Sequence, residues 1–162
     1  KSFPSRPTTD FAKEGIFNVL ENQYSLINLS VLDLCAGTGN ISLEILSREA
    51  GKVISVDKHP ISVRYMHQLK KELEVGEEWT IVKNDVLNYL AKCSDTFDII
   101  FADPPYDMTF HAEIVKLARE KKMLKKDGLC IIEHGKQTNL SNELGYLNTR
   151  NFGNVYFSFF QF

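Results

Sequence analysis

Short apolar runs alternate with longer amphipathic runs along most of the chain, and this alternation restricts the fold more than any other feature. The apolar runs have the length of strands, and they lie at 31–35, 52–56, 79–84, 97–102 and 128–133. The amphipathic runs predict helices at 9–22, 40–49, 60–74, 86–92 and 110–125. Strands that alternate with helices are typical of a parallel sheet covered by helices on both faces. The sequence therefore predicts an α/β fold of three layers.

The C-terminal segment departs from this rhythm. Two strand-like runs, 145–151 and 154–161, are separated only by the turn residues Gly153 and Asn154. Such a short connection indicates a hairpin, so the last strand is expected to run antiparallel to its neighbours. We interpret its aromatic side chains as sheet core rather than as a platform for stacking bases; they are Tyr156, Phe157, Phe159, Phe160 and Phe162.

Composition limits the class of protein. The chain has 162 residues, of which 43% are hydrophobic and 25% charged, as expected for one globular domain rather than a disordered chain or a coiled coil. The net charge of -2 does not suggest a strongly basic nucleic-acid binder, although a local basic face remains allowed. No apolar run approaches the roughly 18 residues of a membrane span.

Cysteine and histidine usage predicts neither a disulfide framework nor a metal site. The three cysteines, Cys35, Cys93 and Cys130, are an odd number without a C-x-x-C pair, so we expect reduced thiols in a cytoplasmic protein. The four histidines show no spacing typical of metal ligands and are interpreted as surface or hydrogen-bonded residues; they are His59, His67, His111 and His134.

The turn after the first strand is the first candidate for ligand binding, because open α/β sheets bind ligands at the carboxyl ends of their strands. Asp33 lies near the end of this strand, and Gly37 and Gly39 follow in a G-x-G turn. Glycines allow a ligand to approach the backbone closely. The third glycine of the dinucleotide fingerprint is replaced by Ser42, so the turn alone indicates little about the ligand.

Acidic residues also follow the next two strands. Asp57, 20 positions after Gly37, is placed to accept the hydroxyls of a ribose. Asp85 follows Asn84 at the end of the third strand, where a side-chain oxygen could accept the amine of an adenine. Each acid alone is more often a loop or helix-cap residue. Together with the glycine turn, they predict a nucleoside pocket.

The fourth strand ends in Asp103-Pro104-Pro105-Tyr106, the sharpest motif in the chain. Two prolines fix the backbone and remove two N–H donors, which leaves their carbonyls free to accept hydrogen bonds. A carboxylate and a rigid carbonyl that face one point suit a planar amine, and Tyr106 could stack on its ring. An ordinary Pro-Pro turn is the competing interpretation, and the neighbouring pocket makes it the weaker one.

These motifs resemble the class I S-adenosylmethionine-dependent methyltransferases, in the amino-methylating branch marked by [DN]-P-P-[YF]. More closely, the sequence resembles the bacterial 16S ribosomal RNA guanine-N2 methyltransferases of the RsmD type. The matching segments are R-P-T-T-D (6–10), F-N (17–18), VLDLCAGTGNISLEILSREA (31–50), Asp57, Asp85, FDIIFADPPY (97–106) and RNFGNVYFSFF (150–160). The opening R-P-T-T-D and the stretch from Gly37 to Arg48 are the segments specific to the RsmD type.

The resemblance implies a single Rossmann-like domain over 1–162, with an N-terminal segment and helix over 1–30. It implies a mostly parallel seven-stranded sheet with a C-terminal antiparallel hairpin strand, S-adenosyl-L-methionine as cofactor, and 16S rRNA or the small ribosomal subunit as partner. We expect a cytoplasmic monomer without membrane or metal. The implied catalytic residues are Asp103, Pro104, Pro105 and Tyr106, and the implied cofactor-binding residues are Thr9, Asp33, Ala36, Gly37, Gly39, Asn40, Asp57, Lys58, Asp85 and Val86.

The chain departs from the family pattern near its start. Where the family has two arginines after Asp10, this chain has Phe11 and Lys13, so one cation is lost. Relatives also begin with a short basic segment that joins in binding RNA and that would precede Lys1, so RNA binding by the residues present is expected to be weak. Arg6, Lys13 and Arg48 are the candidate RNA or cofactor contacts. A basic stretch over the second half and the end of the predicted helix 110–125 is interpreted as a solvated helix face; it comprises Lys116, Arg119, Lys121, Lys122, Lys125 and Lys126.

Three alternatives remain open at the level of sequence. The same chemistry could act on DNA adenine or on another RNA, although a DNA enzyme normally carries a recognition domain for which 162 residues leave no room. A dinucleotide-dependent oxidoreductase is disfavoured by the missing third glycine and the D-P-P-Y motif, and NAD binding would reveal it. A non-catalytic scaffold that binds cofactor is disfavoured by the intact D-P-P-Y motif, and an activity assay distinguishes it.

Overall fold

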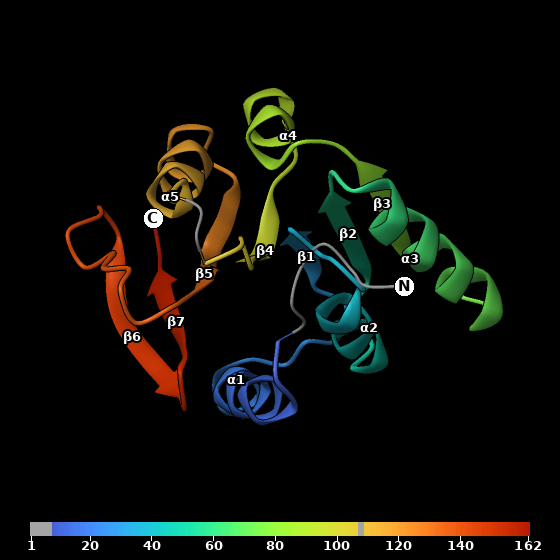
Figure 1. Cartoon of the computed structure of the whole chain (residues 1–162), viewed down its shortest axis with the longest axis horizontal. Helices are drawn as coiled ribbons and strands as arrows, with labels where there is room; N and C mark the ends of the chain where they lie inside the picture. Colours follow the sequence, from blue (N-terminus) through green and yellow to red (C-terminus); the bar gives the residue numbers. More distant parts are fainter. Residues whose placement is uncertain (1–7, 107–108) are drawn as a thin grey trace.

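A computed structural model describes residues 8–106 and 109–162, and within them one seven-stranded sheet has the order β3-β2-β1-β4-β5-β7-β6 (Figure 1). The first five strands are parallel, and they are β1 (Ser30–Leu34), β2 (Lys52–Asp57), β3 (Trp79–Lys83), β4 (Phe97–Ala102) and β5 (Leu124–His134). Most of their apolar residues are buried, and they pack on both faces of the sheet, as expected for a parallel sheet between helices. The chain leaves β3 at one edge of the sheet and enters β4 next to β1. The strand order therefore switches between β1 and β4, and such a switch point is where folds of this kind bind ligands.

The C-terminal hairpin completes the sheet. It consists of β6 (Tyr146–Phe152) and β7 (Val155–Phe160), and β7 lies antiparallel between β5 and β6. Gly153 adopts a φ of +63° in the turn. The predicted hairpin and antiparallel last strand are therefore confirmed. Its aromatic residues divide into two groups: Phe157, Phe159 and Phe160 are core residues as predicted, while Tyr156 and Phe162 are half-buried.

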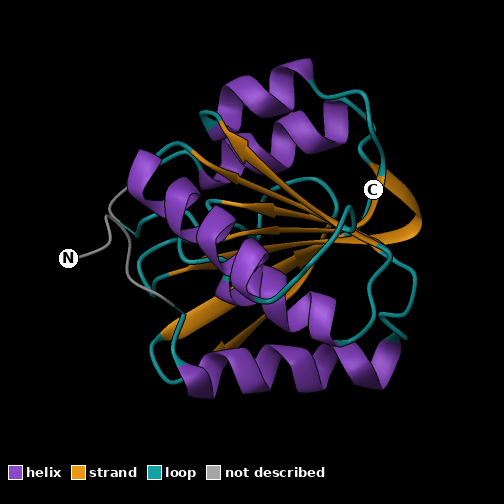
Figure 2. Ribbon diagram, turned by 90° about the vertical axis from the view of Figure 1, so that its right-hand side faces the viewer, coloured by secondary structure: helices purple, strands orange, loops and turns teal. Residues whose placement is uncertain are grey.

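Five helices in the described residues cover the two faces of the sheet (Figure 2). They are α1 (Asp10–Gln23), α2 (Asn40–Ser47), α3 (Pro60–Glu72), α4 (Val86–Lys92) and α5 (His111–Glu120). Buried side chains of α1, α2 and α3 share one apolar cluster with one face of the sheet. Those of α4 and α5 share a second cluster with the opposite face. The predicted three-layer α/β architecture is thus confirmed.

The helix expected over 110–125 is shorter than predicted. Helix α5 ends at Glu120, and Lys122 then adopts a left-handed φ of 53°. The amide of Met123 bonds back to the carbonyl of Ala118, which is the closing bond of a helix C-terminus. Met123 is fully buried, so the chain turns inward and β5 begins at once. The basic stretch is consequently split, with Lys125 and Lys126 on β5 and not on the predicted helix face.

The starts of α1 and α3 follow residues that favour the first turn of a helix. The hydroxyl of Thr9 accepts a hydrogen bond from the amide of Ala12 at the start of α1, and Pro60 is the first residue of α3. Within the described parts of the chain, no helix combines the length and the apolar character that crossing a membrane requires.

Candidate functional site

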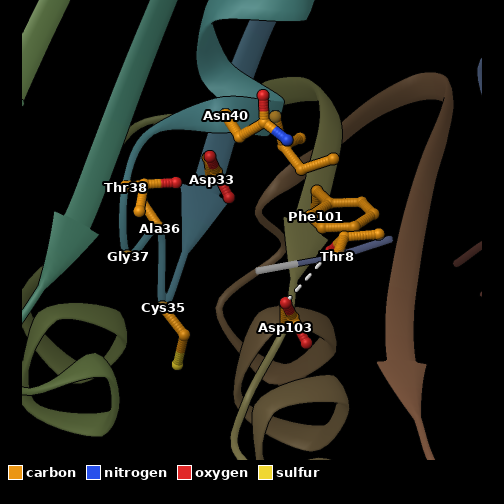
Figure 3. Close-up of a pocket in the computed structure, with 10 residues that line it drawn as sticks. Thr8, Asp33, Cys35, Ala36, Gly37, Thr38, Asn40, Phe101 and Asp103 are labelled. Atoms are coloured by element: carbon orange, nitrogen blue, oxygen red, sulfur yellow. Dashed lines mark hydrogen bonds between the residues drawn. The ribbon is translucent and has the colours of Figure 1, made fainter. Parts of the chain in front are cut away.

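A cavity opens at the carboxyl ends of β1 and β4, where the strand order switches (Figure 3). It is lined by Thr8, Asp33, Cys35, Ala36, Gly37, Thr38, Asn40, Ile41, Phe101 and Asp103. The loop between β1 and α2 therefore forms one wall, and the end of β4 forms the other. The structure thus brings part of the predicted set together at one cavity, namely Asp33, Ala36, Gly37, Asn40 and Asp103. The other residues predicted from these two strand ends do not line it, and they are Gly39, Pro104, Pro105 and Tyr106.

The glycine turn after β1 depends on unusual backbone angles. Cys35, Gly37 and Gly39 have φ values of 57°, 57° and 78°, all in the left-handed region. A Cβ atom at Gly39 would approach Met66 Cγ to 3.0 Å and Trp79 Cζ2 to 3.1 Å. Glycine at this position is therefore required both by backbone conformation and by close packing against α3 and β3.

Asp57 holds the glycine turn in place. Its side chain is 4% exposed, and its Oδ2 accepts a hydrogen bond from the amide of Gly37 at 2.9 Å. Its Oδ1 accepts another from the amide of His59 at 2.9 Å. Neither Asp57 nor Lys58 lines the cavity described above. The ribose contact predicted for Asp57 remains a prediction, and the structure adds a backbone-fixing role.

Three other predicted cofactor contacts have a structural role. Asp85 caps α4 by accepting a hydrogen bond from the amide of Asn88 at 3.0 Å. Val86 belongs to the apolar cluster under α4 and α5. Thr9 caps α1, while its neighbour Thr8 is the residue that reaches the cavity. Their contacts with a cofactor remain predictions.

Asp33 ends a chain of buried hydrogen bonds behind the cavity wall. Its Oδ2 accepts from the hydroxyl of Ser42 at 2.6 Å, and Ser42 in turn lies 2.5 Å from the hydroxyl of Ser55. Trp79 donates its indole N–H to Ser55 at 2.8 Å. Burial raises the pKa of Asp33 to about 7, because desolvation penalises the charged carboxylate. Ser42, which replaces the third glycine of the fingerprint, is thus the residue that orients this acid.

Asp103 meets a second buried acid, Glu133, at the end of β5. The hydroxyl of Thr8 lies 2.7 Å from Glu133 Oε2 and 3.2 Å from Asp103 Oδ2, and Tyr106 donates its hydroxyl to Glu133 Oε1 at 3.1 Å. Burial, and then the charge of Glu133, raise the pKa of Asp103 well above its usual range. Burial also raises the pKa of Glu133, although the hydrogen bonds that it accepts from Thr8 and Tyr106 act to lower it. The D-P-P-Y motif is therefore connected to β5 as well as to β4.

Glu133 was not among the residues that sequence reasoning selected. The signal was available, because acids at the ends of three other strands were selected by position alone. Glu133 closes the apolar run 128–133 in the same way, but no motif surrounds it. Thr8 likewise has no predicted role beyond its place in R-P-T-T-D, although it is 7% exposed and its hydroxyl lies between the two acids.

The basic candidates differ in their surroundings. Lys13 donates to Asn40 Oδ1 at 3.2 Å and lies 3.6 Å from Glu44, so its charge is next to a residue of the cavity wall. Arg48 pairs with Glu44 and, at 2.5 Å, with Glu21. Its guanidinium also lies 4.6 Å from the centroid of the Phe17 ring. The charge of Arg48 is therefore already paired within the protein. Arg6, the third basic candidate, lies outside the described residues.

The cysteine thiols and the side chains able to bind metal are the remaining groups with possible chemical roles. The three cysteines are free, and burial raises the pKa of Cys35 and Cys130, which disfavours reactive thiolates. Among residues 8–106 and 109–162, no group of three or more His, Cys, Asp or Glu side chains could hold a metal ion.

Comparison with known proteins places the chain in a family. The family described as "Conserved hypothetical protein 95" matches residues 1–161. YlbH of Bacillus subtilis, whose name assigns it provisionally as an rRNA methyltransferase, is 34% identical over 146 residues, which cover 88% of this chain and 78% of YlbH. "Ribosomal RNA small subunit methyltransferase D" of Haemophilus influenzae is 31% identical over 134 residues, which cover 79% of this chain and 67% of that protein.

Solved structures share the fold. HI0767 of Haemophilus influenzae, described provisionally as a methylase, superposes with a TM-score of 0.81 at 26% identity and covers 96% of this chain and 90% of its own. SMU.776, determined in complex with SAH, has a TM-score of 0.74 at 18% identity and covers 94% of this chain and 50% of its own. The fold, the D-P-P-Y site and the extent of the family match agree with one another. The chain therefore belongs to the RsmD-type methyltransferase family, which is matched here as conserved hypothetical protein 95.

Proposed function

We propose that the chain transfers a methyl group from S-adenosylmethionine to the exocyclic N2 amine of a guanine in 16S ribosomal RNA. The observation that carries this proposal is the position of Asp103, the first residue of D-P-P-Y, on the cavity wall opposite the glycine turn. The names of the curated relatives support an rRNA substrate. The choice of guanine N2 rests on the resemblance to the guanine-N2 branch of the family.

The residues at the cavity fit this cofactor. Asp33 presents a buried carboxylate to the cavity, which suits an ammonium group, because a buried acid gains from a cation that replaces its lost hydration. Asp57 remains able to accept ribose hydroxyls, since each of its oxygens already takes one backbone N–H and a carboxylate offers about four acceptor sites. When bound, the cofactor supplies a sulfonium methyl group. The backbone of Ala36, Gly37 and Thr38 would pass alongside it.

The acceptor amine needs activation by the protein. The lone pair on guanine N2 is delocalised into the ring, so the free amine is a poor nucleophile. Asp103 and the carbonyl of Pro104 would each accept one N–H hydrogen and turn the lone pair toward the methyl group. The positive charge that develops on nitrogen is stabilised by the same acceptors, which makes the interaction strongest in the transition state.

Bond changes in this reaction balance without a further reactant. S-adenosylmethionine would supply the methyl group and leave as a neutral thioether, so the acceptor amine would gain a C–N bond and a positive charge. One N–H proton then leaves the amine, and Asp103 is the nearest group placed to take it. Tyr106 would stack on the base, and the base would have to be flipped out of its stack to reach the cavity.

The direct test is transfer of labelled methyl from S-adenosylmethionine to unmodified small ribosomal subunits and to naked 16S rRNA, with the product nucleoside identified by mass. N2-methylguanosine at one position is the expected product with at least one of the two substrates. A methylated adenosine would assign the chemistry to another amine-bearing base. Cofactor binding without any RNA methylation would overturn the proposed substrate.

A further inference from the structure

The strongest unassigned feature of the site is Glu133, a buried acid that contacts the D-P-P-Y motif without belonging to it. It is 2% exposed and lies near the end of β5, next to β7, where it pairs in register with Phe157. It does not line the cavity, whereas Asp103 does. Burying a carboxylate costs free energy unless hydrogen bonds compensate it, so the presence of Glu133 at this position suggests a role.

Glu133 is compensated by the site itself. Its two oxygens accept hydrogen bonds from Tyr106 at 3.1 Å and from Thr8 at 2.7 Å. Tyr106 is the residue expected to stack on the acceptor base, and its hydroxyl is thereby fixed to β5. The orientation of this ring is therefore set by a strand that the motif does not contain.

The same acid acts on Asp103 through Thr8. The hydroxyl of Thr8 lies within hydrogen-bond distance of both carboxyl groups, but it has a single proton and can donate fully to only one of them. Its shorter contact is with Glu133, which leaves Asp103 the less compensated of the two. A negative charge on Glu133 therefore favours a proton on Asp103.

We propose that Glu133 is a positioning residue for methyl transfer: it fixes Tyr106 and Thr8, and its charge makes Asp103 a stronger proton acceptor. This inference rests on the proposed amino-methyltransferase function. A carboxylate with a higher proton affinity is a stronger hydrogen-bond acceptor for the amine and a better base for the proton that leaves it. Glu133 thus acts on the substrate only through residues that touch it.

The charge of Asp33 also raises the pKa of Asp103, so its effect must be separated experimentally from that of Glu133. Asp33 and Cys35 face it from the end of β1, and Tyr106 follows it in the chain. Among the described residues, no lysine or arginine forms an ion pair with Asp103 or with Glu133. On β7, the register partner of Glu133 is the apolar Phe157.

Glu133→Gln is the informative variant, because it keeps the shape and one acceptor oxygen and removes the charge. Glu120→Gln makes the same chemical change at an exposed position at the end of α5 and serves as the matched control. Titration of the Asp103 carboxyl by NMR of isotope-labelled aspartate, with Asp103→Asn to identify its signal, gives a readout independent of the substrate. In Glu133→Gln, we expect the Asp103 midpoint to fall by about one pH unit or more.

Kinetics provide the second readout. The rise of kcat with pH should move to lower pH in Glu133→Gln, and the plateau should fall roughly tenfold, within the range usual for proton-transfer groups. The dissociation constant for S-adenosylmethionine should stay within a few-fold. Thr8→Val is expected to shift the Asp103 midpoint in the opposite direction, to higher pH, because it removes a hydrogen bond that stabilises the carboxylate. It also keeps the test decisive if Glu133→Gln does not fold.

The outcomes separate the two proposals. An unchanged Asp103 midpoint in both Glu133→Gln and Thr8→Val overturns the role of Glu133, whatever the substrate is. Absence of RNA methylation by the unaltered chain overturns the proposed function instead, while a shifted Asp103 midpoint would still support the coupling. Loss of activity with an unshifted pH profile in Glu133→Gln would reduce Glu133 to a structural residue.

Discussion

Trp79 donates its indole N–H to Ser55 at 2.8 Å, so the first residue of β3 is tied to the middle of β2 inside the sheet. Through Ser42, this bond reaches Asp33 and holds the carboxylate toward the cavity. Asp33, on β1, is therefore oriented by residues of two other strands and one helix. The pH dependence of the free energy of unfolding should therefore reveal the burial of Asp33.

Asp33→Asn should change stability in a pH-dependent way. Burial raises the pKa of Asp33 from 3.8 to about 7, so the folded state binds the proton more tightly than the unfolded state. The stabilisation from this proton is fully present below about pH 4 and is lost as the pH rises through about 7. As the pH rises between these limits, the free energy of unfolding of Asp33→Asn should therefore increase by roughly 2–4 kcal/mol relative to that of the unaltered chain. Urea unfolding across this pH range measures the difference, and Asp95→Asn, an exposed acid, should show no such trend.

Asp103→Ala should abolish methyl transfer while the affinity for S-adenosylmethionine changes by no more than a few-fold. The reason is that Asp103 is expected to face the acceptor amine and not the parts of the cofactor held by the glycine turn. Labelled-methyl incorporation and calorimetric titration measure the two properties separately. Equal turnover by the variant and the unaltered chain would remove Asp103 from its assigned role.

Asp57→Ala should weaken cofactor binding by roughly 10- to 150-fold, the range expected for charged hydrogen bonds. Part of this loss should come from the glycine turn, because the amide of Gly37 would lose its acceptor. Asp57→Asn keeps one acceptor oxygen and should lose less. Calorimetric titration of both variants with S-adenosylmethionine tests the order; an unchanged affinity in Asp57→Ala would take this residue out of the binding site.

Gly39→Ala should lower the free energy of unfolding by more than Gly153→Ala does. Both glycines have a positive φ, so both variants should lose about 1–2 kcal/mol from backbone strain. Only at Gly39 would the added methyl group meet Met66 and Trp79, whereas a Cβ at Gly153 meets nothing within 4 Å. Chemical denaturation of the two variants isolates the packing cost, and equal losses would show that the backbone alone requires glycine after β1.

Arg48→Ala should affect stability and leave RNA binding unchanged. Arg48 pairs with Glu21 and Glu44 and lies over Phe17, so its charge is already used within the protein. Its side chain is 26% exposed, and solvent screening limits the expected loss to about 1 kcal/mol. Thermal unfolding and filter binding to 16S rRNA measure the two effects. A marked loss of RNA affinity would restore Arg48 as a direct contact.

The sequence predicted the layout of the fold better than the connections within the site. Strand ends could be located because apolar runs stop at polar residues, and this placed Asp33 and Asp103 correctly at one edge of the sheet. The contact between Thr8 and Glu133 could not be predicted, because nothing local in either segment specifies a partner 125 positions away. The end of α5 was missed for a similar reason, since Met123 turns inward to reach a core that only the folded sheet provides.

Given the role proposed for Glu133, the bond between Thr8 and Glu133 would also set the time at which this protein becomes active during its own synthesis. Thr8 is made among the first residues of the segment described here, but its partner leaves the ribosome only after β5, the last of the parallel strands. Until then, the acceptor that β5 provides for the hydroxyl of Tyr106 has not been made. A chain still being translated would therefore bring the glycine turn and D-P-P-Y together without orienting them. The order of synthesis thus delays methylation until nearly the whole domain is made.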